Sequence, residues 1–206
     1  MKNSLSYLIF VLLFIGIGAM VLLWFTDIPV ASETVSVRSE RKEVGQPVDS
    51  LNGVYVYYNG SVGNVSGRNT AADGYNLGLK YQCVEFVKRY YYEHYRHKMP
   101  DSWGHAKDFF EAGLSDGAFN SRRHLTQYTN PSRSKPQVGD LLVYGGSHYN
   151  SYGHVSIVSK VFANALEIIQ QNPGPTASSR ARFDLHKEQG LWKIKHSQIV
   201  GWLRKE

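Results

Sequence analysis

Cys83 is the only cysteine in this chain of 206 residues, and it lies in the stretch YQCVEFV at residues 81–87. A thiolate is a strong nucleophile, and the amino terminus of a helix lowers the thiol pKa because unpaired N–H groups and the helix dipole favour negative charge. Apolar residues at three- and four-residue spacing predict a helix over residues 81–97, so that Cys83 lies in its first turn. The alternative is a structural cysteine, since cysteine is among the most buried residue types.

A cysteine nucleophile needs a base, and histidine is the usual one because its pKa lies near neutrality. Of the eight histidines, His94 and His97 share the predicted helix with Cys83 but lie about three turns away from it. His154 differs from the others because it opens the apolar run HVSIVSKVF, whose alternation predicts a strand. A histidine at a strand start faces the sheet edge, where a helix amino terminus can dock, so His154 is the candidate base.

The third member of such a site accepts the other imidazole N–H and fixes the tautomer. Two amides close the next apolar run, in the stretch IIQQNPG. Gln170 and Asn172 would point to the same side of a strand, and Gln171 to the other side. Either Gln170 or Asn172 could orient His154, and the alternative is a polar strand end that meets solvent before Pro173.

The elements that must hold these residues change in type along the chain. A strand and turn are predicted at residues 53–60, a second, shorter helix at residues 102–113, and loops at residues 61–80 and 114–136. The later apolar runs predict strands at residues 138–145, 154–162, 165–172, 181–186 and 199–204. Helices first and antiparallel strands afterwards indicate an α+β fold, with the helices packed on one face of a sheet.

The amino-terminal segment Leu5–Phe25 carries no charge. As a helix it would span roughly 30 Å, the thickness of a bilayer core, and it ends in aromatic residues where an aromatic belt would fall. A cleaved signal peptide is the alternative, because Val30-Ala31-Ser32 offers a weak cleavage site. We predict an uncleaved signal anchor that holds the soluble domain outside the cytoplasm, in the periplasm or at the cell surface.

The chain is therefore divided into three parts: a transmembrane signal anchor at residues 1–27, a linker at residues 28–50 and a catalytic domain at residues 51–206. The formal net charge is +6, but lysine and arginine are scattered along the sequence. A nucleic-acid-binding protein more often shows a basic stripe with interleaved aromatic residues. We therefore expect no nucleic-acid partner.

The order of Cys83, a GHV motif and a polar-x-Asn strand resembles the CHAP domain, the family of cysteine- and histidine-dependent amidohydrolases and peptidases. Within that family the chain resembles the amidase branch, the amidase domain of glutathionylspermidine synthetase/amidase and of trypanothione synthetase. The resemblance covers residues 53–204 through the stretches GVYVYY, YQCVEFVKRY, SWGHA, VGDLLVY, YGHVSIV, IIQQN and IVGWL. It implies a papain-like α+β CHAP fold, with helices packed on an antiparallel sheet, preceded by one transmembrane helix.

The resemblance also implies roles: Cys83 as nucleophile, His154 as general base, and the Cys83 N–H with the Gln82 side chain as oxyanion donors. The family's third catalytic residue is usually a glutamate two places before an asparagine, whereas this chain has Gln170 before Asn172. A glutamate stabilises the imidazolium by charge, and a glutamine only orients the ring. Papain-type enzymes use a neutral amide, so activity is compatible with Gln170, and Asn172 is the other candidate. No metal or organic cofactor is needed.

The implied reaction is hydrolysis of an amide C–N bond through a thioester. Two substrate classes compete: a glutathionylspermidine-like peptide–polyamine amide, implied by the amidase branch, and a peptidoglycan peptide, favoured by the predicted membrane segment at residues 5–25. A third hypothesis is a catalytically weakened or inactive CHAP domain that serves as a membrane-anchored binding or scaffold module, because Gln170 departs from the family. Cys83 argues against it, since a scaffold has no use for a free exposed thiol.

Overall fold

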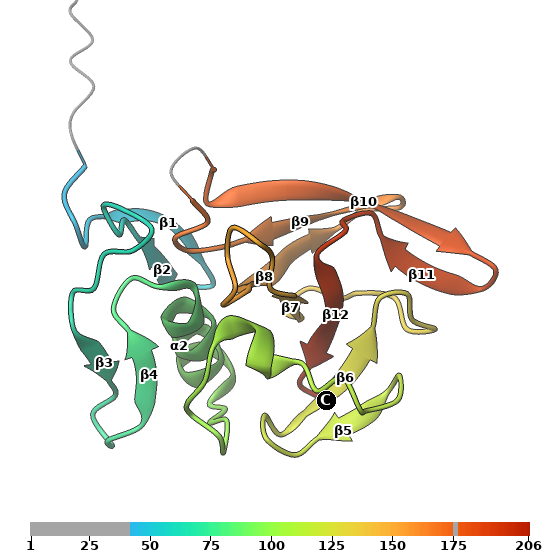
Figure 1. The fold of residues 1–206 in the computed structure, drawn as a ribbon, viewed down its shortest axis with the longest axis horizontal. Coiled ribbons are helices and arrows are strands. Elements are labelled where there is room, and N and C mark those ends of the chain that lie inside the picture. The colour runs from blue at the N-terminus through green and yellow to red at the C-terminus, as the bar shows by residue number, and fades with distance from the viewer. Residues whose placement is uncertain (1–41, 175–176) are drawn as a thin grey trace, which may run out of the picture. The chain divides into compact units, whose positions relative to one another are not determined.

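The computed structural model describes residues 42–174 and 177–206. Its main element is an eight-stranded antiparallel sheet in the order β11-β10-β9-β8-β7-β12-β6-β5 (Figure 1). The strands are β5 (Ala118–Asn120), β6 (Leu125–Thr129), β7 (Leu141–Tyr144), β8 (His154–Val161), β9 (Ala165–Ile169), β10 (Arg180–Glu188), β11 (Leu191–Ile194) and β12 (Ile199–Arg204). Each apolar run predicted as a strand from residue 138 onward overlaps one of them, and the α+β class is confirmed.

Two further antiparallel pairs lie outside this sheet: β1 (Pro47–Leu51) with β2 (Val54–Tyr57), and β3 (Arg68–Thr70) with β4 (Asn76–Leu79). The strand predicted at residues 53–60 is β2. The other three correct the prediction of a linker at 28–50 and a loop at 61–80, and β5 and β6 likewise correct the loop at 114–136. These strands are short and partly polar, so they lack the long apolar alternation from which a strand is predicted.

The α-helix of the described residues, α2 (Cys83–Tyr95), packs against β2, β4 and β8 (Figure 1). Phe86 and Tyr90 lie one helical turn apart and are fully buried, which explains why this stretch is helical. The predicted helix over residues 81–97 is right in type and two residues too long at each end. Tyr81 and Arg96 have φ angles of 66° and 52°, so neither continues the helix.

The second predicted helix, at residues 102–113, is wrong, because the structure has only the short 3-10 helix η1 (Ala106–Phe109) there. Two buried cations bind backbone carbonyls of this segment. Lys88 donates to the carbonyl of Ser102 over 2.8 Å, and Arg123 donates to that of Asp108 over 3.1 Å. Tertiary contacts thus outweigh the local helical pattern.

The apolar side chains of β7 alternate between the two faces of the sheet. Leu141 and Val143 belong to the cluster that packs against α2, whereas Leu142 and Tyr144 belong to the cluster on the other face. Cys83 packs against the first of these clusters. The core therefore fixes the amino terminus of α2 against the sheet.

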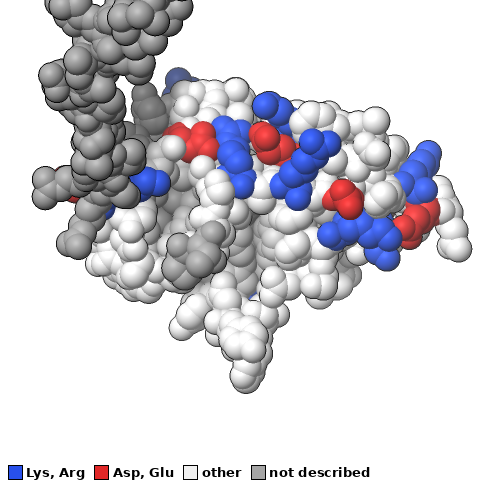
Figure 2. Space-filling model, turned by 90° about the horizontal axis from the view of Figure 1, so that it is seen from above, with Lys and Arg blue, Asp and Glu red and all other residues white. Residues whose placement is uncertain are grey.

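No helix in the parts of the chain that the structure describes is long and apolar enough to cross a membrane. The predicted transmembrane segment Leu5–Phe25 lies outside these parts and stays a prediction. Figure 2 shows one face of the molecule, on which basic and acidic side chains lie next to each other. Charges of opposite sign therefore offset each other on this face.

Candidate active site

Cys83 is the first residue of α2 and follows the N-cap residue Gln82, so it lies in the first helical turn as predicted. Burial raises the pKa of the Cys83 thiol to about 11, while N–H groups of Val155, Val84 and Cys83 itself direct hydrogen bonds to the sulfur and oppose the rise. The predicted lowering of this pKa is therefore wrong. Loss of hydration outweighs the hydrogen bonds that favour the thiolate.

His154 is the first residue of β8 and lies opposite Tyr144 of β7, with the two ring centroids 5.4 Å apart. Burial lowers the pKa of His154 to about 4, and the hydrogen bond with Gln170 acts in the opposite direction. The imidazole is therefore neutral at pH 7 and can accept a proton. The N–H of the next residue, Val155, is among the groups that favour the Cys83 thiolate, so the thiol lies near the start of β8.

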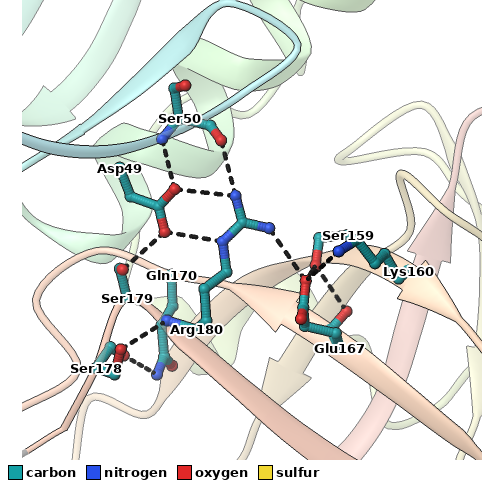
Figure 3. A network of polar contacts seen from close by, with 9 residues as sticks. All are labelled: Asp49, Ser50, Ser159, Lys160, Glu167, Gln170, Ser178, Ser179 and Arg180. Atoms are coloured by element: carbon teal, nitrogen blue, oxygen red, sulfur yellow. Dashed lines mark hydrogen bonds and ion pairs between the residues drawn. The ribbon is translucent and has the colours of Figure 1, made fainter.

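Gln170 follows the last residue of β9, and its side-chain oxygen lies 3.0 Å from Nε2 of His154. Its side-chain nitrogen donates to the carbonyl of Ser178 over 2.9 Å, a contact drawn in Figure 3. A backbone carbonyl only accepts hydrogen bonds, so the amide oxygen is the atom that faces His154. His154 must then carry its hydrogen on Nε2, which leaves Nδ1 as the basic nitrogen.

Asn172, the other candidate for orienting His154, is placed elsewhere. β9 ends at Ile169, and Asn172 has a φ of 54°, so the predicted strand alternation does not extend to it. Its amide donates to Val62 O over 2.9 Å and to Oε1 of Gln82 over 2.7 Å. Of the two amides left open by the sequence, the structure brings Gln170 to the imidazole.

Gln82 uses its side chain to connect loops. Its amide nitrogen donates to the carbonyls of Asn64 over 2.8 Å and Val62 over 3.3 Å, and its oxygen accepts from Asn172. An amide nitrogen has two hydrogens, and both are engaged. In this structure the Gln82 amide thus donates to loop carbonyls, and its role as an oxyanion donor stays a prediction.

A buried polar network that sequence reasoning did not assign to the site joins α2 to the segment after β9. Glu85 accepts from Arg89 Nε over 2.6 Å, from Asn69 over 2.8 Å and from Gln171 over 2.8 Å. Gln171 also donates to the carbonyl of Gln82 over 2.9 Å. The signal in the sequence was the acid–base pair four residues apart on an otherwise apolar helix face.

The charge state of the site follows from these pKa shifts. With a thiol pKa of about 11 and an imidazole pKa of about 4, Cys83 and His154 are both neutral near pH 7. The resting site therefore holds a thiol and an imidazole, not a thiolate–imidazolium pair. Such a site can act by general-base catalysis, in which the proton leaves the sulfur as the sulfur attacks.

Comparison with known proteins identifies the class of domain. Residues 73–172 match the family model of the CHAP domain, so this part of the chain is a CHAP domain. The match includes Cys83, His154, Gln170 and Asn172. It supports a hydrolase that acts on amide bonds.

Two curated relatives carry the same type of domain. Trypanothione synthetase of Crithidia fasciculata is 29% identical over 132 residues, which cover 63% of this chain and 20% of the relative. The bifunctional glutathionylspermidine synthetase/amidase of Escherichia coli (strain K12) is 28% identical over 138 residues, covering 62% of this chain and 22% of the relative. The similarity thus spans about a fifth of each of these proteins.

Solved structures give a weaker likeness. The endolysin LysIME-EF1 is 18% identical with a TM-score of 0.37, covering 69% of this chain and 60% of its own. A structure of Ly7917 with the hydrolysing product of MDP is 20% identical with a TM-score of 0.39, covering 61% and 54%.

Proposed function

We propose that the chain is a cysteine-dependent amidohydrolase in which Cys83 is the nucleophile, His154 the general base and Gln170 the residue that orients the base. The observation that carries the proposal is the hydrogen bond between His154 Nε2 and Gln170 Oε1, at 3.0 Å. It leaves Nδ1 free to take a proton from the Cys83 thiol, which lies near Val155, the neighbour of His154.

The reaction then proceeds through a thioester. The Cys83 sulfur attacks the amide carbonyl while its proton passes to Nδ1 of His154, and Gln170 keeps the resulting imidazolium in place through Nε2–H. When the C–N bond breaks, the imidazolium gives its proton to the leaving amine. Water next attacks the thioester with His154 as base, which releases the carboxylic acid and restores the thiol.

For the substrate, the first candidate is a peptide–polyamine amide such as glutathionylspermidine, because one curated relative is a glutathionylspermidine synthetase/amidase. The second is a peptide of peptidoglycan. The observation in its favour is the uncharged segment Leu5–Phe25, which we propose as an anchor that holds the domain at a membrane, facing out of the cytoplasm.

A scaffold role remains the alternative function, argued from the glutamine at position 170. Against it stands the geometry of Gln170, whose oxygen lies within hydrogen-bond distance of His154 and whose nitrogen is held by Ser178. A neutral amide in this place supplies orientation without charge. The arrangement is that of an enzyme whose base depends on ring placement.

The test is incubation of the full chain with glutathionylspermidine and, in parallel, with purified peptidoglycan, followed by detection of new primary amines. Release of amine from one of them by the wild type and not by Cys83→Ala is the expected result, with the same urea unfolding curve for both proteins. Equal release by the variant would show that Cys83 is not the nucleophile. A wild type inactive on both would favour the scaffold alternative.

A further inference from the structure

The segment Ser178–Arg180 determines how Gln170 lies. The backbone N–H of Gln170 donates to the carbonyl of Ser179 over 2.9 Å, and its side-chain amide donates to the carbonyl of Ser178 over 2.9 Å. Gln170 is 7% exposed, so water cannot readily replace these contacts. Any movement of the Ser178 carbonyl would therefore release the amide that faces His154.

A carboxylate from a distant part of the chain holds this segment. Asp49 of β1 accepts from Ser179 Oγ over 2.7 Å, and from Arg180 Nε over 2.8 Å and Nη2 over 3.0 Å. Arg180 Nη2 also donates to the carbonyl of Ser50 over 2.8 Å, and Figure 3 shows these contacts converging between β1 and the start of β10. The paired contacts of Arg180 with one carboxylate form a bidentate ion pair, which is strong and directional.

This link is made by side chains and not by a sheet ladder, because β1 pairs with β2 in a sheet separate from that of β10. The hydrogen bond from Arg180 holds the pKa of Asp49 below its usual value, ahead of burial, which acts in the opposite direction. Asp49 is thus ionised at neutral pH and can keep both Ser179 and Arg180. The mechanism does not otherwise use any residue of β1.

We infer that Asp49 is a positioning residue for the candidate base, acting through Ser179 and Ser178 on Gln170 and through Gln170 on His154. This inference rests on the proposed function. It means that Asp49 helps to keep the imidazole hydrogen of His154 on Nε2. Without a fixed Ser178 carbonyl, the Gln170 amide can turn its nitrogen toward Nε2, which moves the imidazole hydrogen to Nδ1 and blocks proton transfer from Cys83.

Glu167 of β9 provides a matched control within the same network. It accepts from Arg180 Nη1 over 3.2 Å and from Ser159 Oγ over 2.8 Å, and it lies 3.9 Å from Lys160 (Figure 3). Like Asp49 it pairs with Arg180, but it makes no contact with Ser178 or Ser179. Glu167→Gln removes a charge beside Arg180 and leaves the Asp49–Ser179 contact in place.

The experiment measures kcat and KM for the amide substrate together with ¹⁵N NMR signals of the His154 ring in the full chain. Asp49→Ala should lower kcat by roughly tenfold or more with little change in KM. Losses of this size are usual when a residue that orients a functional side chain is removed. Its ring signals should show loss of the Nε2–H tautomer. Ser179→Ala, which spares the ion pair, should shift both readouts in the same direction, and Asp49→Asn should restore part of the loss.

The control Glu167→Gln should keep kcat within about twofold of the wild type, because partly exposed ion pairs contribute little and the Asp49–Ser179 and Asp49–Arg180 contacts stay in place. Wild-type kcat and a wild-type tautomer in Asp49→Ala would overturn the inference. If Asp49→Ala does not fold, Ser179→Ala and Asp49→Asn decide it by the same two readouts. The NMR arm stands without turnover, so an inactive wild type with the expected tautomer change would contradict the proposed function and leave the positioning role supported.

Discussion

The side-chain amide of Gln171 donates a hydrogen bond to Oε2 of Glu85 over 2.8 Å, across 86 positions of sequence. Glu85 is two residues after Cys83 on α2, and Gln171 follows Gln170 directly. One buried contact therefore sets the distance between the helix that carries the nucleophile and the segment that orients the base. Glu85 also neutralises Arg89, which is 6% exposed, so the same carboxylate serves the fold and the site.

Replacing Glu85 should test how much of the fold depends on this network. Glu85→Ala leaves Arg89 as a buried charge without its partner, so we expect the free energy of unfolding to fall by roughly 3–5 kcal/mol. Urea unfolding measures it, and Glu188→Ala at the exposed Glu188–Lys195 pair is the control, with a much smaller expected loss because exposed ion pairs contribute little. Losses of equal size in the two variants would show that the buried Glu85–Arg89 pair contributes no more to the free energy of unfolding than an exposed pair does.

Alkylation of Cys83 should report the raised thiol pKa. Because the pKa is about 11, the rate with iodoacetamide should be low at pH 7 and should rise about tenfold per pH unit through the alkaline range. The lowered pKa predicted from the sequence would instead give a rate above that of an ordinary thiol near neutral pH. Mass spectrometry follows the reaction at this single cysteine, with glutathione as internal reference. A rate that reaches its plateau below pH 8 would show an activated thiolate.

The lowered pKa of His154, which is half-buried, should make stability depend on pH. Its pKa is about 4 in the folded chain and 6.5 as its ordinary value, so between these values the unfolded chain binds a proton that the folded chain does not. The free energy of unfolding should therefore fall as the pH drops through this window, by on the order of 3 kcal/mol at about 1.4 kcal/mol per pKa unit.

His154→Gln removes the titrating ring and provides the comparison for that prediction. Urea unfolding of wild type and variant between pH 7 and pH 4 isolates the contribution of His154, since the other titrating groups are common to both. The variant should lose less stability across the window. Identical pH dependence in the two proteins would mean that the imidazole is not buried in its neutral form.

Much of the fold follows from the sequence because its central strands are long apolar runs. β7, β8, β9 and β12 are each visible as such a run, and α2 as a helical repeat of apolar positions. The strands β1, β3 and β5 are short and partly polar, and only their pairing partners define them. The 102–113 segment shows the opposite case, a helical pattern prevented by Lys88 and Arg123 from other parts of the chain.

Some features of the candidate site could likewise be predicted from the sequence, and others depend on tertiary packing. Residue type and order proposed Cys83 and His154 and left Gln170 and Asn172 open, and the structure places the Gln170 side chain beside His154. The pKa of Cys83 was predicted in the wrong direction, since burial depends on packing that no local stretch encodes. The contacts of Gln82 could not be predicted for a similar reason, because its acceptors Val62 and Asn64 lie on a separate loop.

Position 170 offers the sharpest test of how the base is tuned. Gln170→Ala should lower kcat by about 10- to 100-fold, since the ring of His154 loses the partner that fixes its tautomer. Gln170→Glu should maintain hydrolysis at pH 7.5 and raise the pKa of His154, because a nearby negative charge favours the imidazolium.

A base works only when it is unprotonated, so raising its pKa should move the acid limb of the kcat/KM profile upward from its wild-type position near pH 4. The carboxylate has no hydrogen for the Ser178 carbonyl, 2.9 Å from the present amide nitrogen, which opposes its ionisation. An acid limb that stays at the wild-type pH would show that this opposition prevails and that the new carboxyl is protonated. Loss of hydrolysis in Gln170→Glu with full activity in Gln170→Ala would instead remove residue 170 from the site.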